Sequence, residues 1–308
     1  MIERQIASLE NKFQQGNYYD ILQSYKALYF RNSAAKKFKE TVALLMSGAT
    51  NFLKYEQWNC AAECAQLLVD TYKNFKTQYN DESKENIVKI FKGFGETECA
   101  AKTNFMRDAI KWSAENGAEK KGSPEFHTLL ANSLAREGDY IDAQKHYIFG
   151  DDPIAFASML KTWAEDSPNK SDADLYIVRA VLGYLCTGKL NDATTLFKSF
   201  TSQVTIDSPL INFTNFLLMT LTRDALPLFK TLRAKYAPSI GRDPDFSKYL
   251  DQIAFVFYKV PLPQSGGLGS LLSGLFGGGG GGMFGGGGNS SAGRSNEDTM
   301  DTATDDAD

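Results

Sequence analysis

The chain has 308 residues, of which 43% are hydrophobic and 23% charged, a composition typical of a globular protein long enough to bury a large core. Residues 265–308 hold 15 of the 26 glycines, six acids and one base, which leaves 31 acids and 32 bases in residues 1–264. This nearly neutral body argues against binding to nucleic acid or to an anionic membrane, because either needs a surplus of lysine and arginine.

The N-terminal residues MIERQIASLENKF carry closely spaced charges and no apolar h-region, so we expect no signal peptide. No stretch is apolar over the roughly 18 residues that a membrane span needs, so we also expect no stable membrane insertion. The four cysteines, Cys60, Cys64, Cys99 and Cys186, fall within apolar helical patterns, as reduced thiols of the cytosol do. The sequence therefore predicts a cytosolic protein.

A short turn pattern recurs along the chain: a helix-breaking residue, then an aromatic residue or leucine, then a small or apolar one. It occurs at GNYYDI (16–21), QWNCAA (57–62), RDA (107–109), GDYIDA (138–143), GKLNDA (188–193) and RDA (223–225). Spacings of this size are typical of helical hairpins of the tetratricopeptide type, although Asp-Ala at a helix start is common enough for chance to be the alternative. The pattern predicts an all-α, right-handed solenoid of six or seven hairpins.

Four dipeptides predict where helices begin: Ser123-Pro124, Asp152-Pro153, Ser208-Pro209 and Asp243-Pro244. Proline is accepted in the first helical turn because no preceding turn clashes with its ring. Gly138 predicts the end of the helix that begins at Pro124. Ser171 and Asp174 resemble a capping box before another helix.

The last third of the chain departs from regular hairpins. SQVTIDS (202–208) predicts a short extended or hairpin segment, and SPLINFTNFLLMT (208–220) is apolar around most of a helix. In GGLGSLLSGLF (266–276), Leu268, Leu271, Leu272, Leu275 and Phe276 form one apolar helical face, but its glycines weaken the helix. The polyglycine and acidic residues that follow predict a disordered tail.

Catalytic or metal-binding chemistry has little support in the sequence. His127 and His146 lack a nearby cysteine or acid at a triad or metal-ligand spacing, so we expect structural or solvated roles for both. Cys60 and Cys64 share a helix face, but no second pair completes a zinc site. The glycine run of the tail follows no strand and is no phosphate-binding loop. We expect no enzyme activity, no cofactor and no metal.

Two regions are candidates for binding other proteins. The N-terminal pair of hairpins combines tyrosines with cations: Tyr18, Tyr19, Tyr25, Tyr29, Arg31, Lys36, Lys37 and Lys39. Tyrosine and arginine are the residues that most often carry binding energy, whereas the alternative is that the tyrosines are core and the lysines a solvated face. The second region is the apolar helix that begins at Pro209, because an excess of apolar side chains requires a central position or a partner.

Blocks of this sequence resemble, in order, the Golgi-to-ER-traffic scaffold family of the tail-anchored-protein targeting pathway, also known as a subunit of the transmembrane-domain recognition complex. They are GNYYDILQSYKALYFR, LLMSGATNFLKYEQW, Trp112, SPEFHTLLANSLAREGDYIDAQKHYIFG, VLGYLC, SPLINFTNFLL and DPDFSKYLDQIAFVFYKVPLPQ. The resemblance covers roughly residues 5–275, and GGLGSLLSGLF also resembles the family's tail. The long polyglycine and acidic end is a departure from it.

The resemblance implies a non-enzymatic adaptor with two docking surfaces. A homodimeric targeting ATPase would bind the N-terminal half, residues 1–150, around Tyr18, Tyr19, Arg31, Lys36 and Asp70. A ubiquitin-like protein or a BAG-family chaperone scaffold would bind the C-terminal half, residues 151–264, through Leu210, Phe213, Phe216 and Leu217 and the preceding 202–208 segment. Residues 265–308 would be the low-complexity tail. The alternative is a generic tetratricopeptide-like subunit of a proteasome-lid or trafficking assembly.

Overall fold

The computed structural model describes residues 2–262, and this part of the chain is helical without any strand. The predicted tail, including the apolar segment 266–276, lies outside the described residues. The α-helices are α1 (Ile2–Lys12), α2 (Tyr18–Ala34), α3 (Phe38–Lys54), α4 (Trp58–Asn74), α5 (Asp81–Gly93), α6 (Ala100–Asn116), α7 (Pro124–Arg136), α8 (Tyr140–Tyr147), α9 (Pro153–Asp166), α10 (Ala173–Cys186), α11 (Leu190–Gln203), α12 (Pro209–Thr222), α13 (Leu226–Lys235), α14 (Ala237–Ile240) and α15 (Phe246–Tyr258); two 3-10 helices are Phe13–Gln15 and Lys170–Asp172.

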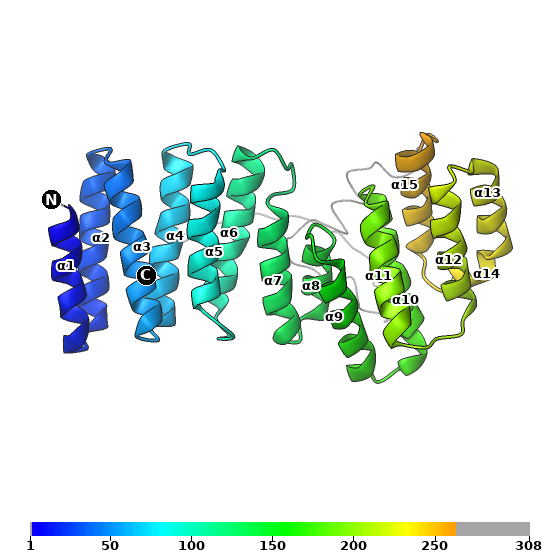
Figure 1. The fold of residues 1–308 in the computed structure, drawn as a ribbon, viewed down its shortest axis with the longest axis horizontal. Helices are drawn as coiled ribbons and strands as arrows, with labels where there is room; N and C mark the ends of the chain where they lie inside the picture. The colour runs from blue at the N-terminus through cyan, green and yellow to red at the C-terminus, as the bar shows by residue number, and fades with distance from the viewer. Residues whose placement is uncertain (1, 263–308) are drawn as a thin grey trace, which may run out of the picture.

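Successive helices stand side by side and alternate in direction, which makes an elongated stack of helical hairpins (Figure 1). Helix α4 contacts α3 within its hairpin and both α2 and α6 in the neighbouring ones. In the C-terminal half, α10 contacts α9, α11, α12 and α15 and has eleven of its fourteen residues buried. The predicted all-α solenoid is confirmed, and one buried core extends from Leu9 to Ala254.

Three of the four predicted helix starts are confirmed. Pro124, Pro153 and Pro209 each occupy the first turn of a helix. The Asp152 carboxylate accepts hydrogen bonds from two backbone N–H groups of α9, and the Ser208 hydroxyl accepts one from α12. These side chains satisfy donors that a helix N-terminus leaves without partners.

Two predictions about helix starts were wrong, and in both places the carboxylate is buried and paired with an arginine. Helix α15 begins at Phe246 and not at Pro244, and no capping box precedes α10. Asp243 is 4% exposed and forms an ion pair with Arg179, whereas Asp174 is 2% exposed and accepts two hydrogen bonds from Arg242, at 2.6 and 3.1 Å. Buried carboxylates need a charged partner, and here those partners come from distant parts of the chain.

The recurring turn pattern has a backbone explanation. Gly16, Gly138 and Gly188 lie in the left-handed region just before a helix, with φ of 77°, 79° and 81°. Equivalent turns place Lys36, Glu56, Lys76 and Asp224 in the same region, with φ of 50–57°. Each such residue reverses the chain between consecutive helices. One assignment within the pattern was wrong, because Arg107–Ala109 lies inside α6.

The small or apolar residue at the end of each recurring turn pattern is mostly buried. Ile21, Ala61, Ala109, Ala143 and Ala193 are buried, while Ala225 is half-buried. The segment 202–208 differs from the prediction because α11 continues to Gln203. Residues 204–208 then form an extended connection without strand pairing.

We expect Gly138→Ala to lower the free energy of unfolding by about 1 kcal/mol, because a Cβ is disfavoured at positive φ. Nothing lies within 4 Å of the position that this Cβ would occupy, so the loss measures backbone strain alone. Glu56→Gly is the matched control. It should raise the free energy of unfolding by about 0.5 kcal/mol, because glycine relieves the same backbone strain. Urea denaturation of both variants tests this, and a shift in the same direction for both would contradict it.

Candidate interaction surfaces

The five residues predicted to bind the first partner form two groups. Tyr18 and Tyr19 begin α2, whereas Arg31 lies near its end, about 18 Å further along the helix axis. Lys36 follows in the turn to α3, and Asp70 lies near the end of α4, which runs parallel to α2 (Figure 1). Arg31, Lys36 and Asp70 therefore share one end of the first hairpins, and the two tyrosines lie at the other.

The two tyrosines have different surroundings. Tyr18 is half-buried and packs against Phe13 and Tyr55, with ring centroids 6.2 and 5.9 Å apart. Tyr19 is 69% exposed, and Phe30, eleven residues further on, is 62% exposed. Three turns of helix separate these two rings, so they lie on the same side of α2. Sequence reasoning missed Phe30, although its spacing from Tyr19 was a visible signal.

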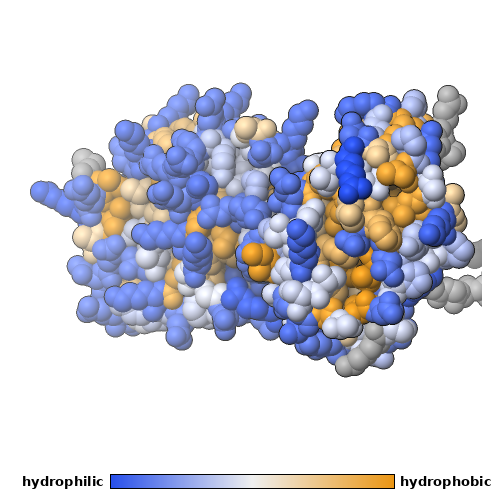
Figure 2. Space-filling view, turned by 45° about the vertical axis from the view of Figure 1, so that its right-hand side comes forward, coloured by the Kyte–Doolittle hydropathy of each residue, from blue (hydrophilic) through white to orange (hydrophobic). Residues whose placement is uncertain are grey.

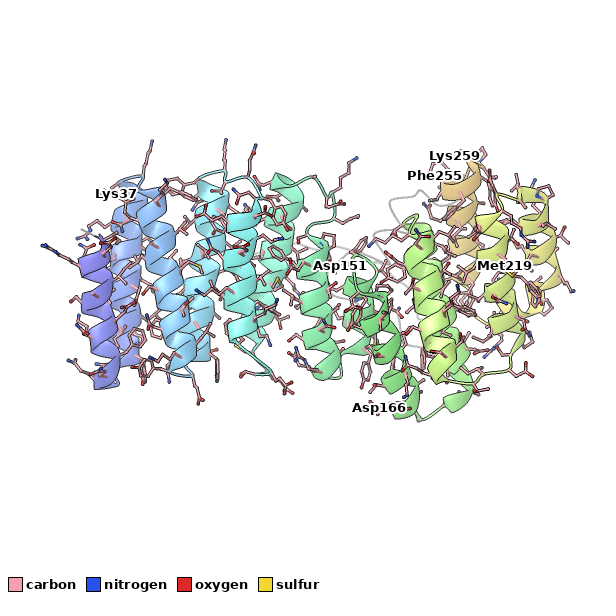
Figure 3. All side chains as sticks on the ribbon, in the orientation of Figure 1. Lys37, Asp151, Asp166, Met219, Phe255 and Lys259 are labelled. Atoms are coloured by element: carbon pink, nitrogen blue, oxygen red, sulfur yellow. The ribbon has the colours of Figure 1, made fainter. Side chains whose placement is uncertain are left out.

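Four cations gather at the end of the first hairpins that holds Arg31. Lys36, Lys37 and Lys39 are exposed like Arg31, and none of the four forms an ion pair within residues 2–262. Lys37 marks this end in Figure 3. Lys37 and Lys39 also lie at the N-terminus of α3, where positive charge opposes the helix dipole. These four cations therefore do not stabilise the helices that carry them.

The adjoining surface of α2, α4, α6 and α8 is different, because its charges are paired between neighbouring helices. Lys26 contacts Glu63 at 2.6 Å, Gln66 donates to Asp108 at 2.9 Å, and Arg107 contacts Asp142. The Asp108 and Asp142 pKa values are lowered by their hydrogen bonds to lysine, glutamine or arginine, despite the opposing effect of burial. Asp70 belongs to the same stripe of α4 and accepts only a long hydrogen bond from Gln66, 3.4 Å.

The predicted C-terminal contact residues are mostly core. Leu210 and Leu217 are fully buried and Phe213 is 1% exposed, so these three side chains are not accessible to a partner on the surface of this chain. Phe213 packs against Tyr236 with ring centroids 5.7 Å apart, and α12 as a whole packs on α10, α11 and α13. Phe216 is 48% exposed and Met219 43%, in agreement with the expected excess of apolar side chains on this helix.

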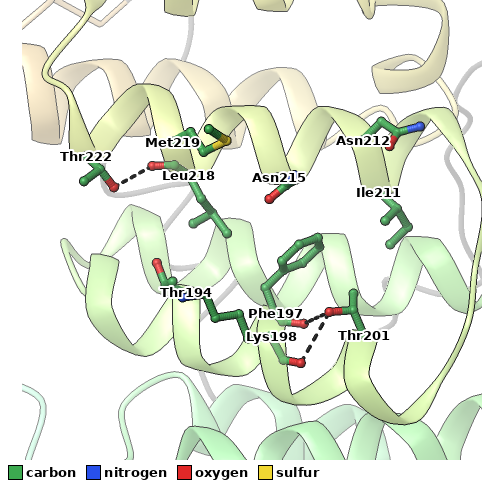
Figure 4. A pocket seen from close by; sticks show the side chains of 10 residues that line it. All are labelled: Thr194, Phe197, Lys198, Thr201, Ile211, Asn212, Asn215, Leu218, Met219 and Thr222. Carbon is green, nitrogen blue, oxygen red and sulfur yellow. Dashed lines mark hydrogen bonds between the residues drawn. The ribbon is translucent and has the colours of Figure 1, made fainter.

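A groove of about 460 Å³ runs between α11 and α12 (Figure 4). Its apolar side chains are Phe197, Ile211, Leu218 and Met219. Its polar side chains are Thr194, Lys198, Thr201, Asn212, Asn215 and Thr222. Figure 2 shows hydrophobic surface over the C-terminal helices, while hydrophilic side chains cover most of the N-terminal ones in that view. A groove with an apolar floor and polar rims is suited to an amphipathic segment.

The only two histidines of the chain contact each other between α7 and α8. Their Nδ1 atoms are 2.9 Å apart, and the His127 Nε2 atom is 2.9 Å from the Lys121 carbonyl oxygen. A carbonyl oxygen can only accept, so His127 Nε2–H donates to it; the neutral His127 then accepts at Nδ1 from the Nδ1–H of His146. Burial lowers the pKa of His127 to about 4 and that of His146 to about 3.

Neither the acidic side chains nor the thiols of the described residues support metal binding. Within residues 2–262, no group of three or more histidine, cysteine or acidic side chains is placed to hold a metal ion. Burial raises the pKa of Cys64 and Cys60 and raises that of Cys186 to about 12, which keeps these thiols protonated and poorly nucleophilic. No helix in this range is both long enough and apolar enough to cross a membrane.

Comparison with known proteins identifies the family. The sequence model of Golgi to ER traffic protein 4 matches residues 35–276, most of the chain. The chain belongs to the Golgi to ER traffic protein 4 family. A relative from Dictyostelium discoideum with that family name is 60% identical over 280 residues, 90% of each chain, and Protein GET4 of Arabidopsis thaliana is 37% identical over 84% of this chain and 91% of its own.

The fold supports the same membership. A crystal structure of C. therm. Get4 matches with a TM-score of 0.77 and 27% sequence identity, covering 90% of this chain and 96% of that chain. These relatives of the Golgi to ER traffic protein 4 family are named for traffic and not for a reaction. Membership places the chain in Golgi-to-ER traffic.

We expect the histidine pair to make the folded state sensitive to mild acid. A histidine whose pKa is lowered on folding takes up its proton more readily when unfolded, so its contribution to stability is complete above pH 6.5 and falls as the pH drops toward 4. Between about pH 7.5 and 5.5 each histidine should remove about 1.4 kcal/mol from the free energy of unfolding.

Urea denaturation at the two pH values measures this loss, and NMR titration of the two imidazole rings measures its cause. Both rings should remain neutral at pH 5.5. A ring that titrates near its ordinary pKa of 6.5 would contradict the pairing.

Proposed function

We propose that this chain is a cytosolic, non-enzymatic adaptor in the post-translational targeting of tail-anchored membrane proteins to the endoplasmic reticulum. Its N-terminal half holds a homodimeric targeting ATPase, and its C-terminal half holds a ubiquitin-like protein or a BAG-family chaperone scaffold. The family match over residues 35–276 is the observation that carries this proposal. Two chemically different surfaces at opposite ends of one solenoid support it.

An adaptor works by raising the effective concentration of one partner near the other. A stack of hairpins suits this role, because each hairpin packs on its neighbours and the two ends stay apart. The surface near Arg31 is cationic and without internal ion pairs, so an acidic patch complements it. The surface of α12 exposes Phe216 and Met219 beside the groove, so an apolar or amphipathic segment complements it.

Affinity capture from a cell extract, with mass spectrometry of the bound proteins, tests the proposal directly. We expect the ATPase and a ubiquitin-like or BAG-family protein to co-purify with the full chain. Recombinant versions of both should then form one ternary complex by size-exclusion chromatography. Recovery of proteasome-lid or coat subunits instead would contradict the proposal.

We expect Arg31→Glu combined with Lys36→Glu to weaken ATPase binding several-fold, with the larger effect at low salt. Exposed charges at an interface act mainly through association rate and are screened by salt. The melting temperature should change little because neither residue has an ion pair to lose within residues 2–262. The matched control is Arg223→Glu with Lys259→Glu, two exposed cations near the other end of the solenoid. Equal affinities for the two double variants would show that the ATPase surface lies elsewhere.

We expect Phe216→Asp combined with Met219→Asp to abolish binding of the second partner while ATPase binding persists. Both side chains are exposed, so the variant should fold, whereas aspartate at the buried Phe213 would unfold the C-terminal half. Leu228→Asp on α13 is the control, because Leu228 is 52% exposed but lies outside the groove. Isothermal titration calorimetry with the purified partner measures the effect, and unchanged affinity of the folded double variant would remove α12 from the interface.

A further inference from the structure

The described chain ends against the two helices, α11 and α12, that form the walls of the groove. At the end of α15, the Tyr258 hydroxyl donates to the Thr220 carbonyl oxygen of α12 at 3.4 Å. Val256 lies 3.6 Å from the position that a Cβ on Gly188 would occupy, in the turn that leads into α11. Thr222 and Thr194 line this same end of the groove. The chain therefore leaves the solenoid at the end of α11 and α12 that holds these two threonines, near Lys259 (Figure 3).

The next apolar segment of the chain is near enough to reach the groove. Five residues lie between Leu262, the last described residue, and Leu268, and the six steps between the two Cα atoms span up to about 20 Å. Leu268, Leu271, Leu272, Leu275 and Phe276 repeat at the spacing of one helical face. The family match includes this segment and stops at residue 276, where the polyglycine begins.

The segment and the groove match in size and chemistry. From Thr194 to Thr201 the α11 wall spans two helical turns, about 10 Å, which equals the rise from Leu268 to Leu275 in a helix. The groove offers four apolar side chains between polar rims. Glycines within the segment make it a marginal helix in isolation, so it needs a surface to hold it.

We propose that residues 268–276 dock in cis, with their leucine face in the groove between α11 and α12. The short connection to α15 favours this occupant, because a tether of this length gives an effective concentration of roughly 1 mM. An intrinsic dissociation constant about tenfold below that concentration gives about ten docked chains for each open one. Docking covers Met219, and any other ligand of the groove competes with the segment.

One consequence rests on the proposed function: a second partner that uses α12 must displace the segment and is thereby held to a lower apparent affinity. The docking itself does not rest on that function, since it involves this chain alone. Two separate experiments keep the two ideas distinguishable.

Hydroxyl-radical footprinting of the full chain tests the docking. Oxidation of Met219 is compared between the wild-type chain and the variant Leu271→Asp with Leu275→Asp, and Tyr19 and Phe30 serve as exposed references at the far end. We expect Met219 to be labelled about tenfold faster in the variant, while the references stay unchanged. The matched control adds the same charge at polar positions of the segment, Ser270→Asp with Ser273→Asp, and should keep Met219 protected.

Equal labelling of Met219 in the wild type and in the leucine variant would overturn the proposal. Protection that rises with protein concentration would also overturn it, because a second copy would then be the occupant. Adding a synthetic peptide of residues 266–278 to the leucine variant should restore protection in a saturable manner. Loss of partner capture with normal footprints would refute the proposed function and leave the docking intact.

Discussion

The contact between each helical hairpin and its neighbours is the constraint on which the rest of the molecule depends. Buried aromatic rings provide much of it: Tyr72 stacks on Trp112 with centroids 4.9 Å apart, and Phe156 contacts both Tyr147, at 4.9 Å, and Tyr184, at 5.7 Å. Such pairs add to the stabilisation that burial of the rings already gives. Because every hairpin depends on the next, the two ends are held at a fixed separation without direct contact.

Local sequence signals were sufficient for the architecture. Gly138 and the prolines at 124, 153 and 209 act within one turn of backbone, so their effect can be predicted from neighbouring residues. Asp174 and Asp243 could not be predicted in this way. Their arginine partners lie 68 and 64 residues away, and a buried carboxylate has the same sequence appearance as a helix cap.

The candidate surfaces were harder to predict because they depend on which side of a helix is covered. Helix α12 is apolar on most sides, so periodicity alone does not distinguish the buried Phe213 from the exposed Phe216. The groove requires α11 as its second wall, and the histidine pair joins residues from two helices. Each of these features depends on how separate helices pack together, and not on the spacing of residues within a single helix.

The ion pairs of the C-terminal half help to set where the last helix packs. Arg179 and Arg242 join α10 to the segment before α15 through Asp243 and Asp174. Removing such charges from water is costly, so well-packed apolar residues could stabilise the same site equally well, but ion pairs fix one geometry. That geometry places α15 against α10, and it brings the end of α15 to Thr220 and the turn at Gly188. The position at which the chain leaves the solenoid, beside α11 and α12, thus depends on two ion pairs with buried carboxylates at the other end of the same helix.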